Sequence, residues 1–123
     1  MRFAVYDEIE SDRETAARLI SEYYGTKGFL PDILQFKQAE EFTGLFQRHS
    51  FSAVFIGINN MGGVDAAWVM RGRDKICPLI IMSGSGDYSL EGYRLEAADY
   101  LLKPLDERKF YKALDRLKKH NKI

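Results

Sequence analysis

Five short apolar runs divide the chain into segments. They cover residues 3–6, 33–36, 53–58, 79–82 and 100–102, and they are rich in β-branched or aromatic side chains. Polar residues, glycine or proline bound the runs, a pattern typical of β-strands. The runs at 53–58 and 79–82 are apolar on consecutive residues rather than on alternate ones. Such strands are buried on both faces, so the sequence predicts a parallel sheet covered by helices.

Helical spacing fills the segments between the runs. Apolar side chains recur at i, i+3, i+4 and i+7 in two places: Ala16, Leu19, Ile20 and Tyr23, then Phe110, Ala113, Leu114 and Leu117. A shorter stripe begins at Ala39, and residues 64–70 and 88–95 have lengths that suit helices. Strands that alternate with helices in this way predict a doubly wound α/β fold with five βα units.

Residues at the expected helix ends refine this prediction. Ser11 followed by Glu14 predicts a capping box at the start of the first helix. Asp106 is placed to cap the last helix, and Ser83 and Ser85 are candidates to cap the fourth. The basic residues at 116–122 suit a last helical turn whose cations complement the helix dipole. A lead into a further domain is the alternative interpretation of this basic end.

Composition excludes several classes of protein. The chain has 123 residues, of which 46% are hydrophobic, enough for the core of one domain. The 18 Lys and Arg residues balance the 18 Asp and Glu residues, which argues against a general binder of nucleic acid or membrane surfaces. A single cysteine, Cys77, excludes an internal disulfide and a cysteine-based zinc cluster. With an acidic N-terminal segment and no apolar run of membrane-spanning length, we expect a cytoplasmic protein.

The candidate chemistry lies at the carboxyl ends of the predicted strands. In an open parallel sheet, ligands bind at that edge. Asp7 follows the first run, Gly57 and Asn59 lie at the end of the third, Ser83 follows the fourth, and Lys103 follows the fifth. The sequence therefore predicts that an acid, a hydroxyl and an amine converge at one edge of the sheet.

These residues, in this order, resemble the receiver domains of bacterial response regulators. The resemblance covers essentially the whole chain, 1–123, and is strongest at residues 97–105, Ala-Ala-Asp-Tyr-Leu-Leu-Lys-Pro-Leu. Together with residues 87–93, this segment is similar to the receiver half of LytTR-type (AgrA/LytR-like) regulators. The resemblance implies a three-layer, flavodoxin-like (CheY-like) fold with strand order 2-1-3-4-5. It also implies a cis peptide bond between Lys103 and Pro104.

The match to the family's site is partial. In the family, two acids after the first strand bind Mg²⁺ and an aspartate ending the third strand accepts a phosphoryl group. A hydroxyl after the fourth strand and a lysine after the fifth contact that group, and an aromatic on the fifth strand reports its arrival. Four residues match: Asp7 as the second acid, Ser83 as the hydroxyl, Lys103 as the lysine and Tyr100 as the switch aromatic.

Tyr6 and Gly57 depart from the family pattern. Tyr6 stands at the position of the first acid, and Gly57 stands at the phosphoacceptor position. Glycine cannot form an acyl phosphate, and one remaining carboxylate is a poor site for Mg²⁺. The resemblance therefore implies a degenerate receiver with no cofactor, in which Mg²⁺ binding is lost or weak and no enzymatic activity is expected.

The two departures predict a rearranged site. Lys103 has lost its acidic partner, and an unpaired buried charge is costly, so we expect this lysine to turn to Asp7 or to water. We also expect the ring of Tyr6 to lie over Gly57, because glycine leaves room for a large side chain opposite.

Two classes of function remain open. The first is a signalling module that binds protein partners or itself without phosphorylation, alone or as the regulatory half of a LytTR-type transcription regulator. Tyr88, Tyr93 and Tyr111 are the candidates for its interaction face, around the fourth helix, fifth strand and fifth helix. No direct contact with nucleic acid or membrane is expected. The second class is a phosphorelay member that accepts phosphate at a non-standard residue, for which Asp7 is the only acid in place. A generic small-ligand protein of flavodoxin-like fold has no supporting motif.

Overall fold

The computed structural model describes residues 1–46 and 51–119. Strands β1 to β5 cover Arg2–Tyr6, Asp32–Phe36, Ala53–Gly57, Leu79–Ser83 and Asp99–Leu102. Helices α1 to α5 cover Glu10–Gly25, Ala39–Leu45, Met61–Arg73, Ser89–Arg94 and Glu107–Lys119. A short 3₁₀ helix, η1, covers Gly86–Tyr88 directly before α4. Every predicted strand is present, and its ends lie within one residue of the predicted ones.

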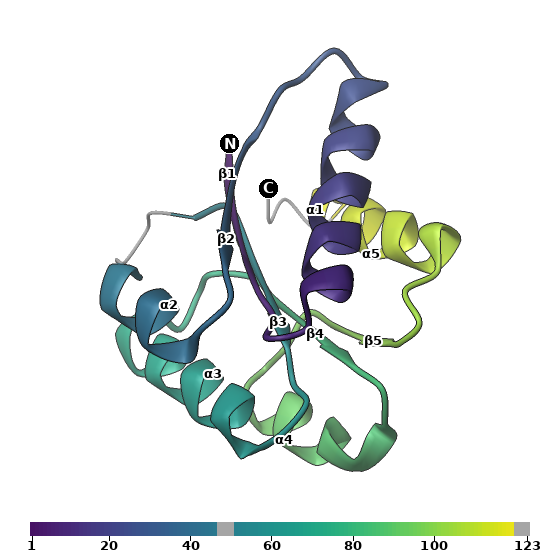
Figure 1. The fold of residues 1–123 in the computed structure, drawn as a ribbon. Helices are drawn as coiled ribbons and strands as arrows, with labels where there is room; N and C mark the ends of the chain where they lie inside the picture. The colour runs from purple at the N-terminus through teal and green to yellow at the C-terminus, as the bar shows by residue number, and fades with distance from the viewer. Residues whose placement is uncertain (47–50, 120–123) are drawn as a thin grey trace.

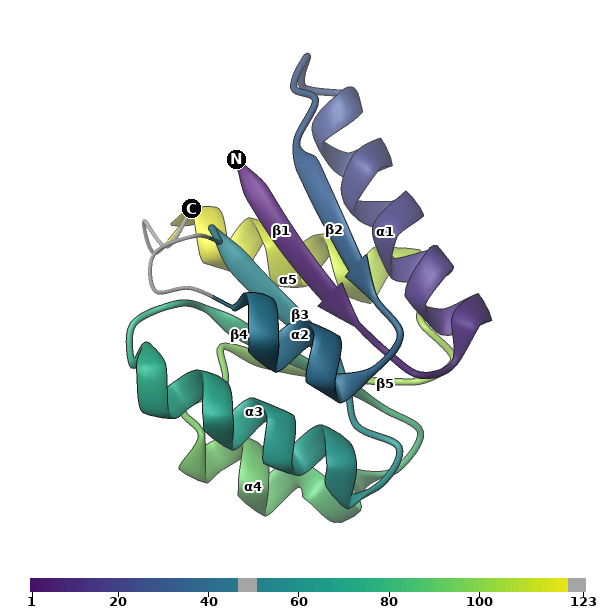
Figure 2. The ribbon, with the colours of Figure 1, turned by 60° about the vertical axis from the view of Figure 1, so that its left-hand side comes forward.

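The strands form one parallel sheet in the order β2-β1-β3-β4-β5. Helices α1 and α5 cover one face of this sheet, and α2, α3 and α4 cover the other (Figures 1 and 2). The predicted doubly wound, three-layer α/β fold is therefore confirmed.

Side chains alternate between two cores, one on each face of the sheet. Ala4 and Tyr6 of β1 belong to the core under α2, α3 and α4. Phe3 and Val5 belong to the core under α1 and α5, where the rings of Phe55 and Phe110 stack 5.2 Å apart. All residues of β3 and β4 are buried. This burial on both faces explains why their sequences are apolar without alternation.

The helix starts agree only partly with the sequence. Helix α1 begins at Glu10, so Ser11 lies inside the helix and the predicted capping box is wrong. The turn before α1 is closed instead by Asp7, whose Oδ1 accepts a hydrogen bond from the Ile9 N–H at 3.0 Å. Asp106 Oδ1 accepts from the Arg108 N–H at 3.2 Å and caps α5 as predicted.

Two further expectations concern Ser85 as a helix cap and the basic end of the chain. Ser85 Oγ accepts from the Asp87 N–H at 2.9 Å, which caps η1 at the start of the α4 segment. Arg116 of the basic end pairs with Asp99 of β5, while residues 120–122 lie outside the described residues. Among the described residues, no helix combines the length and the apolar character that crossing a membrane requires.

Candidate functional site

Asp7 lies at the centre of the site, directly after β1. Its side chain is fully buried, with 0% of its surface exposed. Its Oδ1 accepts hydrogen bonds from the Ile9 N–H and from Asn59 Nδ2, both at 3.0 Å. Its Oδ2 receives no hydrogen bond of good geometry from the described residues, but lies 2.8 Å from the Nζ of Lys103. The charge of this lysine is therefore what compensates the buried carboxylate.

Lys103 follows β5, and its side chain is only 8% exposed. Its Nζ lies 2.8 Å from Asp7 Oδ2 and 2.9 Å from Asp12 Oδ2, and it donates to Asn59 Oδ1 at 2.9 Å. The contact with Asn59 has hydrogen-bond geometry, and the contacts with the two carboxylates are ion pairs. The prediction that Lys103 turns to Asp7 is confirmed. The Lys103–Pro104 peptide bond is cis, as predicted.

Gly57 ends β3 beside Asp7 and leaves the space that the Asp7 carboxylate occupies. A Cβ atom built on Gly57 would lie 2.0 Å from Asp7 Oδ2 and 2.2 Å from its Cγ. Carbon atoms do not approach other heavy atoms that closely without a covalent bond. The side chain of Asp7 therefore fills the volume in which any side chain at position 57 would begin.

Tyr6 is not part of this cluster, and the expectation that its ring covers Gly57 is wrong. The ring stacks on Phe42 of α2, with ring centroids 5.9 Å apart and an interplanar angle of 7°. Side chains alternate along a strand, so Tyr6 faces the α2–α4 layer whereas the next residue, Asp7, faces Gly57. The residues that follow β1 are two acids, Asp7 and Glu8.

The hydroxyl of Tyr6 donates to Glu8 Oε1 at 3.2 Å. Burial, and then the neighbouring Glu8 carboxylate, raise the pKa of this hydroxyl well above its ordinary value. Tyr6 is therefore a protonated core residue, and it supplies Glu8 with a hydrogen bond at the rim of the site.

Ser83 and Tyr100 lie beside the cluster. Ser83 is buried at the end of β4, where its backbone oxygen accepts from the Lys103 N–H at 2.8 Å. Its Oγ accepts from the Ser85 N–H at 3.4 Å, and the described contacts of Lys103 Nζ do not include this hydroxyl. Tyr100 of β5 is partly buried, and its hydroxyl donates to the Ser85 carbonyl at 2.6 Å. The loop after β4 is thus tied to β5 by side-chain and backbone hydrogen bonds.

The three tyrosines expected at an interaction face have different surroundings. Tyr93 of α4 is 83% exposed, whereas Tyr88 is partly buried against the core under α2, α3 and α4. Tyr111 of α5 packs on Tyr23 of α1, with ring centroids 5.4 Å apart. Helices α4 and α5 flank the edge strand β5 from opposite faces of the sheet, so an interaction face that includes these tyrosines stays a prediction (Figure 1).

Two residues of the site were missed by sequence reasoning. Asp12, in the first turn of α1, supplies the second carboxylate to Lys103. Arg13 is buried beside it and donates to the backbone oxygen of Asp7 at 3.0 Å. The sequence did offer a signal for Asp12. It is an acid in the first turn of α1, and this turn begins beside the end of β1. Asn59, noted only as the end of the third run, bridges Asp7 and Lys103 through its side-chain amide.

The donor set does not suit the Mg²⁺ ion that the family resemblance implies. Mg²⁺ requires near-octahedral oxygen ligands and usually takes one or two free carboxylates. Both oxygens of Asp7 are engaged, one by N–H groups and one by Lys103, and Asp12 Oδ2 is engaged by the same lysine. The described residues contain no group of three or more His, Cys, Asp or Glu side chains that could hold a metal. The ammonium group of Lys103 lies between the carboxylates of Asp7 and Asp12.

Comparison with known proteins identifies the family. The profile of the response regulator receiver domain matches residues 9–115. The sensory transduction protein LytT of Oceanobacillus iheyensis is 28% identical over 87 residues, which are 68% of this chain. The chain spans about a third, 35%, of the length of that relative.

Solved structures agree on the fold. The response regulatory domain of mrkE from Klebsiella pneumoniae has a TM-score of 0.79 at 20% identity, covering 98% of this chain and 97% of that one. The receiver domain of AraT from Geobacillus stearothermophilus has a TM-score of 0.77 at 22% identity, covering 98% and 95%. With the profile match over most of its length, this chain belongs to the response regulator receiver domain family, the signalling fold of two-component systems.

Proposed function

We propose that this receiver domain does not take up phosphate and that it acts by binding protein partners. The observation that carries the proposal is the position of the Asp7 carboxylate. It occupies the volume in which an acceptor side chain at position 57 would begin, and Lys103 already neutralises it. The site is thus satisfied by its own residues.

The alternative, phosphorylation of a non-standard residue, is less favoured. Asp7 is the acid nearest the acceptor position, but it is fully buried and both of its oxygens are engaged. A carboxylate attacks a phosphoryl donor only when one oxygen is accessible. Asp7 would therefore have to break its pair with Lys103 and move toward solvent before it could react.

Incubation with radiolabelled acetyl phosphate and MgCl₂ tests the proposal. We expect no label on the wild-type chain, beside a receiver domain with an acceptor aspartate as the positive control. We also expect no change in the amide signals of Asp7, Asn59 and Lys103 when MgCl₂ and beryllofluoride are added. Label on the wild-type chain that disappears in Asp7→Asn would contradict the proposal and establish the alternative.

We further propose that this domain is the regulatory half of a LytTR-type transcription regulator located in the cytoplasm. The support is the match to the sensory transduction protein LytT, of which the chain spans about a third, 35%. Contact with DNA would then belong to another domain, in keeping with the zero net charge of this one. Extending the coding sequence in both directions and testing the full protein for DNA binding checks this assignment.

Self-association is the protein contact we propose first, through the face formed by α4, β5 and α5. Leu90 and Leu102 are more than half exposed on this face, as is Tyr93. Sedimentation velocity should show a concentration-dependent dimer that Leu102→Glu weakens. Leu34→Glu, at an exposed position on β2 at the other edge of the sheet, is the matched control and should leave the dimer unchanged.

A further inference from the structure

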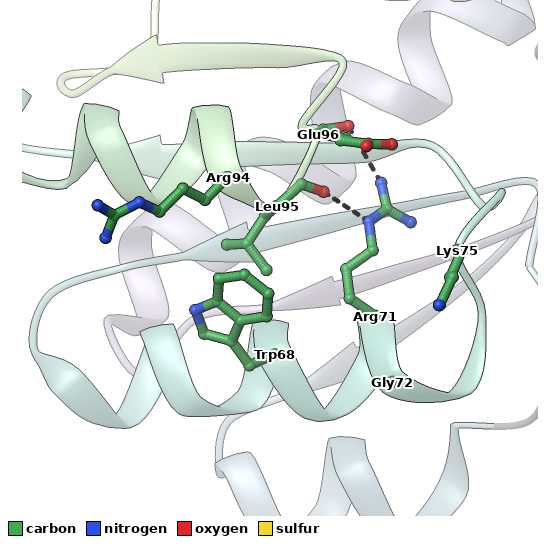
Figure 3. A pocket seen from close by; sticks show the side chains of 7 residues that line it. All are labelled: Trp68, Arg71, Gly72, Lys75, Arg94, Leu95 and Glu96. Carbon is green, nitrogen blue, oxygen red and sulfur yellow. Dashed lines mark hydrogen bonds between the residues drawn. The ribbon is translucent and has the colours of Figure 1, made fainter.

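A groove lies between α3 and the turn that joins α4 to β5. It has a volume of about 330 Å³, and its lining includes Trp68, Arg71, Lys75, Arg94, Leu95 and Glu96 (Figure 3). Adjoining hollows that share Arg71, Lys75, Arg94 and Glu96 extend it toward Ile76 on one side and Tyr93 on the other. The lining residues precede β4 and β5 in the sequence. The groove therefore lies at the amino ends of the strands, whereas Asp7 lies at their carboxyl ends.

Arg71 makes the groove a preformed feature. Its side chain is buried and donates to the backbone oxygens of Leu95 at 2.7 Å, Glu96 at 3.2 Å and Cys77 at 2.6 Å. Figure 3 shows the first two of these links, which join α3 to the α4–β5 turn across the floor of the groove. The two walls are therefore held at a fixed separation.

Large apolar side chains stand exposed along the groove. Trp68 is 42% exposed, Ile76 71% and Tyr93 83%, while Leu95 forms a buried apolar floor. Exposed apolar side chains that gather beside a hollow mark interaction sites more often than scattered ones do. An apolar side chain of a partner would bury surface against Trp68, above the floor that Leu95 forms.

Two cations, Lys75 and Arg94, stand at the rim of the groove, and Glu96 is the acid in its lining. Arg71 adds a third positive charge, which is buried in the floor. Within the described part of the chain, no carboxylate lies within ion-pairing distance of Lys75. Arg94 has Glu91 at 3.9 Å, and that carboxylate also accepts from the Trp68 indole N–H at 3.0 Å. The groove therefore combines an apolar centre with cations at both ends.

We propose that this groove binds an acidic peptide segment of a partner protein, with an apolar residue of the segment seated against the exposed ring of Trp68. Acidic residues on either side of that anchor pair with Lys75 and Arg94. This assignment deepens the proposed function by naming a partner surface. The binding experiment below measures peptide binding at the groove and does not depend on phosphorylation. A failure to bind the peptide would therefore not contradict the proposal that the domain takes up no phosphate, and phosphorylation of the domain would not contradict peptide binding.

Gly72 supports this assignment from the sequence side. It lies inside α3 and lines the groove, and a Cβ built on it would meet nothing within 4 Å. Glycine inside a helix is less stable than alanine, and no neighbour here requires it. Its effect is to keep the groove wide, so a large side chain at this position should close the groove without disturbing the core.

Trp68 makes the binding measurable directly, because it is the single tryptophan of the chain. The probe is a synthetic peptide, acetyl-Glu-Asp-Leu-Phe-Asp-Glu-amide, titrated against the full chain at low salt. We expect a saturable change in Trp68 emission and amide shifts confined to α3 and the α4–β5 turn. The same peptide with lysine at every acidic position should produce neither change.

Variants assign the binding to the groove. The double variant Lys75→Glu and Arg94→Glu should weaken binding about tenfold, and added salt should weaken binding to the wild type. Gly72→Leu should abolish it while leaving the thermal unfolding cooperative. The double variant Lys112→Glu and Lys118→Glu, an equal charge change at exposed positions of α5 across the sheet, should have no effect. Equal binding of the lysine peptide, no saturable binding, or full binding by Gly72→Leu would each overturn the proposal.

Discussion

The ion pair between Lys103 and Asp7 decides what the residues at the sheet edge can do. Both side chains are buried, so each charge would be unstable there without the other. Asn59 holds the pair by donating to Asp7 and accepting from Lys103. Asp12 adds a second carboxylate to the lysine, and its side chain remains 25% exposed. The buried carboxylate of Asp7 thus has Lys103 as its countercharge, whereas Lys103 also has the carboxylate of Asp12.

This asymmetry predicts unequal costs for removing each partner. Lys103→Met leaves the Asp7 carboxylate buried without a countercharge and should lower the free energy of unfolding by about 3–5 kcal/mol. Asp7→Asn should cost less, because Asp12 still pairs with the lysine. Urea denaturation of both single variants and the double variant measures the coupling between the two sites.

The double variant should be more stable than the sum of the two single losses predicts. Additive losses would show that the two charges do not interact and would contradict the ion pair. Lys112→Met, on the exposed face of α5, controls for the loss of a lysine and should change stability by less than about 0.5 kcal/mol.

At the scale of elements, α4 approaches β5 closely at a glycine. A Cβ on Gly92 would lie 3.2 Å from Ile81 Cδ1 and 3.2 Å from Tyr100 Cδ2. The ring of Tyr100 cannot retreat freely, because its hydroxyl is bonded to the Ser85 carbonyl at 2.6 Å. The short helix α4 therefore packs on the sheet through a position that has no side chain.

Gly92→Ala and Gly72→Ala form a matched pair of helix substitutions. Gly72→Ala meets open space and should raise the free energy of unfolding by about 0.5–1 kcal/mol. Gly92→Ala gains the same helix propensity but crowds Tyr100 and Ile81, so it should be less stable than Gly72→Ala by about 1–2 kcal/mol. Thermal unfolding of the two variants provides the comparison, and equal stabilities would show that α4 can move away from β5.

The strands were predictable from the sequence because burial on both faces leaves an uninterrupted apolar run. The pairing of Lys103 with Asp7 was predictable because Asp7 was the one acid recognised at the strand ends. The position of Tyr6 was not predicted correctly, although its spacing of two residues from Ala4 places both on the same face of β1. Asp12 and Arg13 were missed because their places depend on how the first turn of α1 packs across the end of β1.

On the scale of the whole molecule, two cores enclose groups that ionise only with difficulty. Burial, and then Asp74, raise the pKa of the Cys77 thiol to about 12 from an ordinary value of 9.0. Burial also raises the pKa of Tyr24 to about 12 from 10.0. The folded chain therefore keeps these protons at alkaline pH, where the unfolded chain releases them.

Stability should consequently fall above about pH 9. At a pH below the pKa values of the unfolded chain, the folded and unfolded states both hold these protons, and stability does not depend on them. As the pH rises from there toward 12, the unfolded chain loses its protons first, and the free energy of unfolding falls. Each group can lower the free energy of unfolding by about 1 kcal/mol per pH unit within its own window. Urea denaturation at pH 7, 9 and 10.5 measures the slope, and Cys77→Ala should reduce it. A slope unchanged in Cys77→Ala would exclude the thiol as a cause.

Arg71 has a consequence for how the domain opens to solvent. Its guanidinium group donates hydrogen bonds to backbone oxygens in the loop before β4 and in the turn before β5. Strand β4 and helix α4 separate these two segments in the sequence. Releasing either segment alone would leave a buried cation short of acceptors, which is costly. The end of α3, the loop before β4 and the turn before β5 should therefore exchange their amide hydrogens as a single cooperative unit rather than fray one by one.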